Sequence, residues 1–513
     1  MRRQVASFGS LLFMFSFYVI AVSLLAYFLS TQFLWILLGV EILSIFFAFY
    51  VMINKKRRME TRIRWSIFIV FFPILGIGSY VYFGRMYHYD TVKDYKYKNF
   101  SDFGNKTKDQ MFDHVLPVMN EDIPEYKRAF MMGLNEQSDL IYKNTSVSFL
   151  PNGTDAWVSI FNDISSAKNY ILINLYIIED GELCRNFVQA LKNKIEEGVR
   201  VYIIYDFAGS YAKFDLKVQK ELKMMGAHLV PFSPIVMPFV DWKANYRDHR
   251  KDFSIDGRIG YTGGINLSDE YINMSKKYGY WNDSMVRVVG EAVQGIEKIF
   301  ASDWKFIKKG KEKITDWEPE VGKLHPKKNN NKDLIQIVSS GPNHASPLHL
   351  DLLLNLIGSA QKRIWLSTPY FVPPIELIKA ISSAAKSGID VRLVLPGMSD
   401  KFMLLDVSKK WTDELYESGV KVYSMNNIFN HTKAFLFDDE ICFTGTTNMD
   451  FRALFTDQQT MLLVKSKEFN SQLENRFIDD FKTSFLYNFK PSREHKWFTR
   501  LIVNIYNIIS PLL

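Results

Sequence analysis

The octapeptide HRKDFSID at residues 249–256 recurs as HTKAFLFD at residues 431–438. Both copies follow the pattern H-x-K-x-x-x-x-D. In each copy a glycine follows the histidine after 14 residues and an asparagine after 17. The shared positions are His249, Lys251, Asp256, Gly263 and Asn266 in the first copy and His431, Lys433, Asp438, Gly445 and Asn448 in the second. A lone H-x-K carries little information, whereas agreement at four further offsets in two distant stretches is hard to obtain by chance.

The sequence around each motif is also repeated, which predicts two similar halves. Residues 166–206 and 359–396 both show an apolar strand, a loop, an amphipathic helix, a glycine and a second apolar strand. This alternation predicts α/β halves, each with a largely parallel sheet. We place the first half at residues 136–305 and the second at 333–490, joined by a polar linker at 306–332.

The repeated residues have the chemistry that a phosphodiester needs. Residues i and i+2 of a strand share a face, so His249 and Lys251 can project together, as can His431 and Lys433. If the halves pack about a pseudo-twofold axis, one pocket receives two imidazoles, two ammonium groups and two asparagine amides. The paired glycines would let backbone approach the ligand, and the motif aspartates would brace a loop. Cations and amides stabilise phosphate oxygens, and imidazoles serve covalent and acid–base steps.

A purely structural role and a metal site are the alternatives. One histidine on an apolar strand is more often a core residue, but two lysines beside two histidines are costly to bury without an anion. Zinc is disfavoured because the other histidines are scattered and ammonium groups would repel a metal. We therefore expect no metal and no other cofactor. The two cysteines, Cys184 and Cys442, are too few for a disulfide framework, and we expect both to be small buried residues.

The first 90 residues are predicted to be a membrane-spanning segment. Residues 4–40 carry no charge, the apolar run resumes after Glu41, and a third uncharged run covers 65–84. A helix needs about 20 apolar residues to cross the hydrocarbon, more than a cleaved signal peptide contains. The chain is thus predicted to be a multi-pass protein of the cell membrane. We predict two to three spanning helices, near residues 11–29, 33–53 and 66–84.

Basic residues suggest how this segment is oriented. Four consecutive basic residues at 55–58 separate the second and third runs, which is typical of a cytoplasmic loop. If all three runs cross, the rest of the chain lies outside. Pro73, Gly76 and Gly78 would instead allow the third run to bend and return. The sequence leaves open which side the motifs face.

The distribution of charge argues against a nucleic-acid partner. Residues 1–85 hold nine basic and two acidic side chains, whereas the other 428 residues hold 54 basic and 53 acidic ones. The formal net charge of +8 therefore belongs mostly to the membrane segment. The remainder lacks the broad basic surface with which proteins grip a phosphate polymer.

On these motifs the chain resembles the phospholipase D superfamily, which is defined by two H-x-K-x-x-x-x-D motifs. Within it the chain is similar to the bacterial cardiolipin synthases. The similarity covers nearly the whole chain and includes FFPILGIGSYVYFGR, YGYWND, SSGPN, TPYFVPP and the C-terminal SPLL. It implies two phospholipase D-like α/β halves packed about a pseudo-twofold, preceded by transmembrane helices.

The resemblance implies reversible phosphatidyl transfer between two phosphatidylglycerol molecules, which gives cardiolipin and glycerol. One motif histidine forms a phosphatidyl-histidine, with His249 favoured for this role, and the other acts as general acid and then base. The implied ligands of the phosphate oxygens are Lys251, Lys433, Asn266 and Asn448. Asp256 and Asp438 belong to the catalytic motif, with a structural role favoured over a chemical one. The family needs no metal.

Two positions that orient the histidines in the family differ between the halves. Asp283 stands at the head of a strand after the first motif, and Gln459 stands at the matching place after the second, where relatives usually carry glutamate. We therefore expect Asp283 beside His249 and Gln459 beside His431, although unequal loop lengths leave the pairing open. A carboxylate favours imidazolium and suits a general acid, whereas an amide leaves a neutral ring and suits a nucleophile. With this pairing, the electrostatic argument favours His431 as the nucleophile, whereas the resemblance to the family favours His249.

Other functions and segments remain open at this stage. A phospholipase D that uses water as acceptor, and a membrane-tethered nuclease or other phosphodiesterase, would use the same residues. Residues 91–135 are predicted to be a linker, and residues 491–513 an amphipathic segment close to the membrane. The expected partners are phosphatidylglycerol and other membrane lipids. The oligomeric state does not follow from the sequence.

Overall fold

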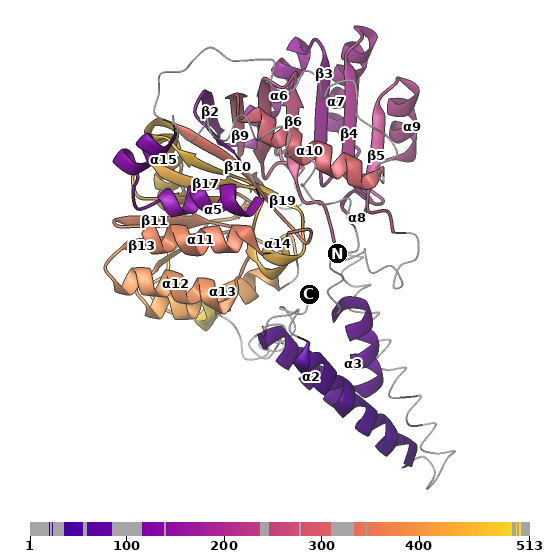
Figure 1. The fold of residues 1–513 in the computed structure, drawn as a ribbon, viewed down its shortest axis with the longest axis vertical. Coiled ribbons are helices and arrows are strands. Elements are labelled where there is room, and N and C mark those ends of the chain that lie inside the picture. Colours follow the sequence, from indigo (N-terminus) through magenta and orange to yellow (C-terminus); the bar gives the residue numbers. More distant parts are fainter. Residues whose placement is uncertain are drawn as a thin grey trace. The chain divides into compact units, whose positions relative to one another are not determined.

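The chain divides into an N-terminal unit, which holds the apolar segment, and a larger unit, which holds both motifs (Figure 1). Both belong to a computed structural model. It describes residues 20, 23, 35–54, 59–84, 115–137, 140–235, 246–275, 279–308, 333–344, 346–401, 403–494, 499 and 502–503. The predicted span at 11–29 and the predicted amphipathic segment at 491–513 therefore lie largely outside the described residues.

One helix of the N-terminal unit is long and apolar enough to cross a membrane, within the described part of the chain. This helix, Trp35–Ile53, lies within the predicted span at 33–53. A second helix, α2 (Met59–Phe71), packs along it, since Ser66 Oγ donates a hydrogen bond to the carbonyl of Ala48 at 3.1 Å. It is followed by α3 (Pro73–Ser79) and a π-helical turn at Tyr80–Gly84.

The predicted span at 66–84 is a helical hairpin rather than one straight helix. The rings of Trp65 and Tyr80 are 5.4 Å apart, although 15 residues of straight helix would separate them by roughly 22 Å. A Cβ on Gly76 would lie 2.6 Å from the Cα of Ile69, so only glycine permits this approach of α3 to α2. The reversal begins at Pro73, which cannot donate a backbone hydrogen bond.

Each half of the larger unit is built on a sheet with the same strand order. The order β2-β9-β7-β6-β3-β4-β5 of the first half is repeated as β10-β19-β17-β16-β11-β13-β14 in the second, which adds β1 and β20 at its edges. The strands of the first sheet are β2 (Thr145–Leu150), β3 (Tyr170–Leu175), β4 (Arg200–Asp206), β5 (His228–Phe232), β6 (Lys251–Ile255), β7 (Ile259–Gly263) and β9 (Met285–Gly290). Those of the second are β1 (Ile141–Tyr142), β10 (Leu334–Ser340), β11 (Arg363–Ser367), β13 (Asp390–Leu395), β14 (Lys421–Met425), β16 (Ala434–Phe437), β17 (Ile441–Gly445), β19 (Gln459–Lys465) and β20 (Ser484–Leu486).

The expectation of largely parallel sheets is wrong, because both sheets are mixed. Only β3, β4 and β5, and their counterparts β11, β13 and β14, run parallel within their sheets. Helices connect these strands, as parallel pairing requires. The two motif strands, β6 and β16, are antiparallel to the strands that follow them. A tight turn at Asp256 or Asp438 joins each motif strand to the next one.

Helices cover both faces of each sheet, which explains the continuous apolar runs in the sequence. On β3, Ile171 and Ile173 face one helical layer, while Tyr170 and Leu172 face α10 on the other side. The helices of the first half are α6 (Gly153–Ser166), α7 (Glu182–Glu196), α8 (Phe207–Ser210), α9 (Leu216–Met224) and α10 (Val293–Ile307). Those of the second are α11 (Leu348–Ser359), α12 (Ile375–Lys386), α13 (Leu404–Glu417), α14 (Phe451–Phe455), α15 (Lys467–Lys482) and a 3-10 turn at Pro491–Glu494.

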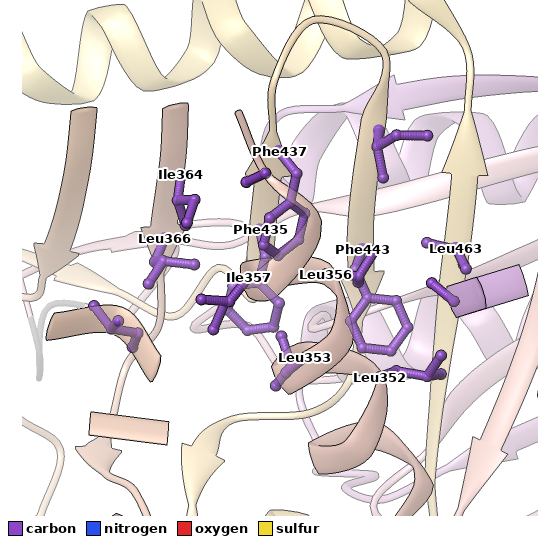
Figure 2. Close-up of a cluster of buried hydrophobic side chains, with 14 of the residues drawn as sticks. Leu352, Leu353, Leu356, Ile357, Ile364, Leu366, Phe435, Phe437, Phe443 and Leu463 are labelled. Carbon is purple, nitrogen blue, oxygen red and sulfur yellow. The ribbon is translucent and has the colours of Figure 1, made fainter. Parts of the chain in front are cut away.

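The core of the second half shows how one helix is fixed on its sheet. Figure 2 shows side chains of α11 facing side chains of β11, β16, β17 and β19. Leu353 and Leu356 of α11 and Phe435 and Phe443 of the sheet are completely buried. Removal of one such leucine side chain typically costs about 2–5 kcal/mol.

Part of the predicted linker at 91–135 belongs to the core of the second half. Residues 115–122 and α5 (Lys127–Gln137) are helical, and Phe130 and Met119 are completely buried in the cluster that contains α11. The short strand β1, which was expected in the first half, pairs with β10 of the second. These apolar residues are brought to the second half by tertiary contacts that local sequence does not show.

The halves also share structure. Helix α10 of the first half contacts β10 of the second, and α15 of the second contacts β2 of the first. The short strand β8 (Tyr280–Asn282) pairs in parallel with β15 (Ile428–Asn430), whereas β12 (Phe371–Val372) and β18 (Met449–Asp450) pair within the second half. Both cysteines are buried and free, which confirms the expectation for them.

Candidate active site

Both motifs place the histidine and lysine in the same local arrangement. His249 lies two residues before Lys251, which is the first residue of β6. His431 directly follows β15, and Lys433 directly precedes β16. Each lysine turns back on its own histidine: Lys251 Nζ donates to the His249 carbonyl at 2.5 Å, and Lys433 Nζ donates to the His431 carbonyl. In the second half Lys433 Nζ also lies 2.7 Å from Nδ1 of His431, so ammonium and imidazole are in contact there.

Each motif histidine is anchored by the backbone of the opposite half. The amide of His249 donates to the carbonyl of Gln458 at 2.9 Å, and the amide of His431 donates to the carbonyl of Asn282 at 2.6 Å. These two acceptor residues directly precede Gln459 and Asp283, the residues expected to orient the histidines. These reciprocal bonds bring the two motifs to one site.

The side-chain partners of the histidines are the reverse of those expected. His431 Nδ1 lies 2.6 Å from Oδ2 of Asp283, and His249 Nδ1 lies 3.1 Å from Oε1 of Gln459. The carboxylate therefore serves the second histidine and the amide the first, so the expected pairing within each half is wrong.

Strand pairing between the halves is the reason for this crossing. Strand β8 ends at Asn282 beside Asn430, so Asp283 emerges next to His431. On the other side, a parallel bridge joins Asp248 to Gln458, the residue before Gln459. Neither pairing is visible in the order of residues along the chain.

The residue that follows the repeated glycine differs between the halves, and in each half it suits the side chain that orients a histidine. A Cβ on Gly264 would overlap the carboxylate of Asp283, so the absence of a side chain there makes room for it. The matching residue of the second half is Thr446, whose hydroxyl donates to Oε1 of Gln459 at 2.6 Å. Each half thus carries a matched pair, Gly264 with Asp283 and Thr446 with Gln459.

The repeated glycines have a structural role that differs from the expected one. A Cβ on Gly263 would lie 2.6 Å from the carbonyl of Ser284, and a Cβ on Gly445 would overlap the carbonyl of Thr460. Gly445 also has a φ of +157°. These glycines allow a neighbouring strand to approach, rather than a ligand.

The site carries an excess of positive charge. Burial first, and then the lysine ammonium groups, lower the pKa of His249 and of His431 well below its ordinary value. Burial also lowers the pKa of Lys251 well below its ordinary range and that of Lys433 to about 8. Burial raises the pKa of Asp283 to about 6, although Lys433 opposes this shift. A bound anion would offset the repulsion between these cations.

The two motif asparagines differ in what their amides contact. Asn266 accepts a hydrogen bond from the amide of Ile177 at 3.1 Å and donates to the hydroxyl of Tyr271 at 2.6 Å. Asn448 is buried, and its Oδ1 has no hydrogen-bond partner within the described part of the chain. Asn448 is therefore the more available of the two expected phosphate ligands.

The motif aspartates, grouped with the catalytic residues on sequence grounds, lie at the far ends of their strands. Asp256 accepts backbone hydrogen bonds from residues 168–170, and Asp438 accepts them from residues 361–363. The hydroxyl of Tyr126 also donates to Asp438 at 2.8 Å. Both carboxylates brace the start of a neighbouring strand and do not contact the histidines.

Aromatic side chains that sequence reasoning missed surround the histidines. The ring of Tyr176 lies 4.6 Å from that of His249, while Tyr370 and Trp281 lie 6.2 and 5.5 Å from His431. Tyr176 directly follows β3 and Tyr370 lies three residues after β11, so the tyrosines occupy similar but not equivalent places, and the repeat gives only a weak signal for them.

A buried arginine, also missed, joins the halves behind the site. Arg250 Nη1 donates to Asp303 at 2.8 Å, and Nη2 donates to Ser339 at 2.6 Å and to Gln458 at 3.0 Å. The last two partners belong to the second half. The corresponding residue of the second motif is Thr432, so the repeat gives no signal for this contact.

Within the residues that the structure describes, no group of three or more histidine, cysteine, aspartate or glutamate side chains could hold a metal ion.

Comparisons with known proteins agree with the motifs. Residues 160–304 and 353–481 match the family described as "Cardiolipin synthase, PLD-like domain", and residues 42–85 match "Phospholipase_D-nuclease N-terminal". A protein named cardiolipin synthase from Geobacillus kaustophilus is 30% identical over 475 residues, which cover 91% of this chain and 92% of that protein. One of the same name from Listeria welshimeri is 30% identical and matched over 99% of its length, with 93% of this chain covered.

A solved structure also shares the fold. The crystal structure of a phosphatidylserine synthase from Haemophilus influenzae superposes with a TM-score of 0.58 at 15% identity. The match covers 76% of this chain and all of the other. At this identity the likeness concerns the architecture of the two halves.

Proposed function

Since the chain belongs to the cardiolipin synthase family, with two phospholipase D-like halves, we propose that it transfers a phosphatidyl group between two phosphatidylglycerol molecules. The products are cardiolipin and glycerol. The observation that carries this proposal is the crossed contact of each motif histidine with an orienting side chain of the other half. These reciprocal contacts support a pseudo-twofold relation between the halves, with one phosphate held at its axis.

His249 is the nucleophile in this mechanism. Gln459 Oε1 is a carbonyl oxygen and can only accept, so Nδ1 of His249 carries the proton and Nε2 keeps its lone pair. The lowered pKa keeps this ring neutral. Because the amide lies beside the first histidine, the electrostatic argument and the resemblance to the family now both favour His249.

His431 is the general acid and base. Asp283 accepts the Nδ1 proton of His431 and stabilises the imidazolium relative to a ring with a neutral partner. In the free protein, burial and the lysines lower the pKa of His431, and a bound phosphodiester would raise it by offsetting their charge. His431 Nε2 then protonates the leaving glycerol oxygen.

The complete reaction consists of two displacements at phosphorus. His249 Nε2 forms a bond to phosphorus as the bond to the glycerol oxygen breaks, and the oxygen receives the His431 proton. The hydroxyl of a second phosphatidylglycerol then gives its proton to His431 and attacks phosphorus, and the P–N bond breaks. Lys251, Lys433 and the asparagines hold the other phosphate oxygens during both steps.

The assay uses the full-length protein with labelled phosphatidylglycerol. We expect cardiolipin and glycerol, and we expect His249→Ala or His431→Ala to lower transfer by about 10⁴-fold or more. His228→Ala, which removes an exposed histidine on β5, is the matched control and should retain activity. Phosphatidic acid as the sole product would indicate a hydrolase, and cleavage of DNA without lipid turnover would indicate a nuclease.

A trapped intermediate tests the assignment of the nucleophile. The protein is quenched in acid-free denaturant during turnover of phosphate-labelled lipid, and the modified peptide is sequenced. We expect the phosphatidyl group on His249. Its presence on His431 would overturn the assignment without affecting the proposed reaction.

We also infer that the chain crosses the membrane twice and that both motifs face the cytoplasm. Helix α2 has 13 residues, so its length of roughly 20 Å is less than the ~30 Å of the hydrocarbon core. Since α3 reverses direction, the hairpin would enter and leave on the side of the basic residues 55–58, which is the cytoplasmic side. The runs at 11–29 and Trp35–Ile53 would supply the two crossings.

Cysteine labelling in whole cells tests this topology. Lys386 is exposed on α12, and both native cysteines are buried, so Lys386→Cys provides a specific site. We expect a membrane-impermeant maleimide to label it only after permeabilisation. Thr31→Cys, between the first two runs, should be labelled in intact cells and serves as the control. Labelling of Lys386→Cys in intact cells would contradict the inferred topology.

A further inference from the structure

A short loop of the second half places a lysine against a tyrosine that neighbours His431. The hydroxyl of Tyr370 donates to both carboxylate oxygens of Asp400, at 2.8 and 2.9 Å, and the tyrosine is buried. Lys401, the next residue, places Nζ 4.3 Å from the centroid of the Tyr370 ring. That ring lies 6.2 Å from the ring of His431. The buried tyrosine therefore supports the ammonium group at a defined place near the site.

Lys401 is exposed, and its charge is not consumed by an ion pair. In the region that the structure describes, no carboxylate lies within ion-pair distance of Lys401 Nζ, since Asp400 contacts the tyrosine hydroxyl instead. Burial and the site lysines dominate the lowered pKa of His431, and burial dominates that of Lys433; the ammonium group of Lys401 adds only a minor contribution to each. Arg452 is different: it interacts with Tyr176 on the side of His249 and is paired with Asp457 at 3.1 Å.

The proposed reaction needs a second anion-binding position. The acceptor is itself a phospholipid, so its own phosphate must be held while its terminal hydroxyl attacks. Lys251 and Lys433 are occupied by the reacting phosphate at that moment. The acceptor hydroxyl must approach on the side of His431, which removes its proton.

We propose that Lys401 binds the non-reacting phosphate of the acceptor lipid and thereby selects a phospholipid over water or free glycerol. The proposal rests on the function proposed above. In the product, the two phosphorus atoms are six covalent bonds apart. Lys401 Nζ is 4.3 Å from the centre of the Tyr370 ring, which is 6.2 Å from the centre of the His431 ring. The sum of these two distances is the upper limit on the distance from Lys401 Nζ to the His431 ring. The six bonds between the two phosphorus atoms, together with one ion-pair contact between the second phosphate and Lys401, can cover this separation.

Two reactions of the full-length protein separate acceptor binding from the chemical step. The first is formation of cardiolipin from phosphatidylglycerol in mixed micelles. The second is exchange of labelled glycerol into phosphatidylglycerol, which uses the same donor and the same histidines but a neutral acceptor. We expect Lys401→Ala to lower the first about 10- to 100-fold, the value of a lost charge-assisted contact, with a raised KM for phosphatidylglycerol. The rate of glycerol exchange should stay within about twofold of that of the unchanged protein.

Two further variants serve as comparisons. Lys401→Arg keeps the positive charge and should restore most cardiolipin formation. Lys386→Ala removes an exposed lysine at the far end of α12 and should leave both reactions unchanged.

Several outcomes would overturn the proposal. Equal losses in the two reactions would place Lys401 in the chemical step or in folding, and no loss in either would exclude a binding role. A selective loss in Arg452→Ala instead would place the acceptor phosphate on the side of His249. If the unchanged protein exchanges glycerol but makes no cardiolipin, the proposed function fails, and the acceptor site fails with it.

Discussion

The partners of the two motif histidines differ by a single group, a carboxylate for His431 and an amide for His249. In the proposed mechanism this difference divides the work between the two rings. A carboxylate stabilises the imidazolium form, and an amide oxygen only selects the tautomer. Gly264 and Thr446 maintain the difference, because the first makes room for the carboxylate and the second binds the amide oxygen.

A change of Gln459→Glu should make the two partners alike. The new carboxylate would raise the pKa of His249, so a larger fraction of the nucleophile would be protonated at a given pH. The acidic limb of the pH–rate profile for cardiolipin formation should therefore move to higher pH by about one unit or more. Gln189→Glu, on the exposed face of α7, is the control and should leave the profile in place. A profile that stays unchanged in Gln459→Glu would mean that His249 is not the group whose neutral form is required.

At the scale of the elements, the motif aspartates explain how each motif strand is set against its neighbour. Asp438 begins the turn after β16 with a φ of +51° and accepts the backbone amides at the start of β11. Asp256 does the same for β6 and β3, with a φ of +53°. Each aspartate thus holds its motif strand beside a neighbouring strand, β6 beside β3 and β16 beside β11. The spacing of the motif, with the acid at the far end, is required by strand length rather than by chemistry at phosphorus.

Asp438→Asn should affect stability more than catalysis. The amide group cannot accept all the hydrogen bonds that reach the carboxylate, so the free energy of unfolding should fall by about 1–3 kcal/mol. Denaturant unfolding in detergent measures this change, and transfer per folded molecule should stay within about twofold.

The neighbouring residue provides the control for that prediction. Asp439→Asn removes ion pairs with Lys362 and Arg363 at the surface, and pairs of this kind contribute little to stability. Loss of transfer in Asp438→Asn without loss of stability would show that the motif acid takes part in the reaction after all.

At the scale of the larger unit, the halves cannot be separated without dismantling the site. Each histidine takes its backbone and side-chain partners from the other half, and one hydrophobic cluster contains residues of both. The helical residues 115–137, which precede the first half in the chain, pack into the second. The connection between the halves along the chain is therefore not what holds them together.

A cut between the halves tests this conclusion. A protease site is inserted within residues 309–332 of the full-length protein, which is then cleaved in the membrane. We expect both fragments to stay together in the membrane fraction and to keep most of the transfer activity, because the shared core and the crossed contacts remain. The uncut protein with the same insertion is the control. Release of the C-terminal fragment together with loss of activity would contradict the prediction.

The sequence by itself determined the two halves, the two repeated motifs and the apolar N-terminal segment. Repetition at equal spacing marks the motifs, and uncharged runs mark segments suited to a membrane, since both signals are local. Tertiary structure alone decided which partner serves which histidine, that the third apolar run turns back at Pro73, and that residues 115–137 belong to the second half. These features depend on contacts between residues distant in the chain, such as the pairing of β8 with β15, and no local pattern of side chains encodes which distant strand will be the neighbour.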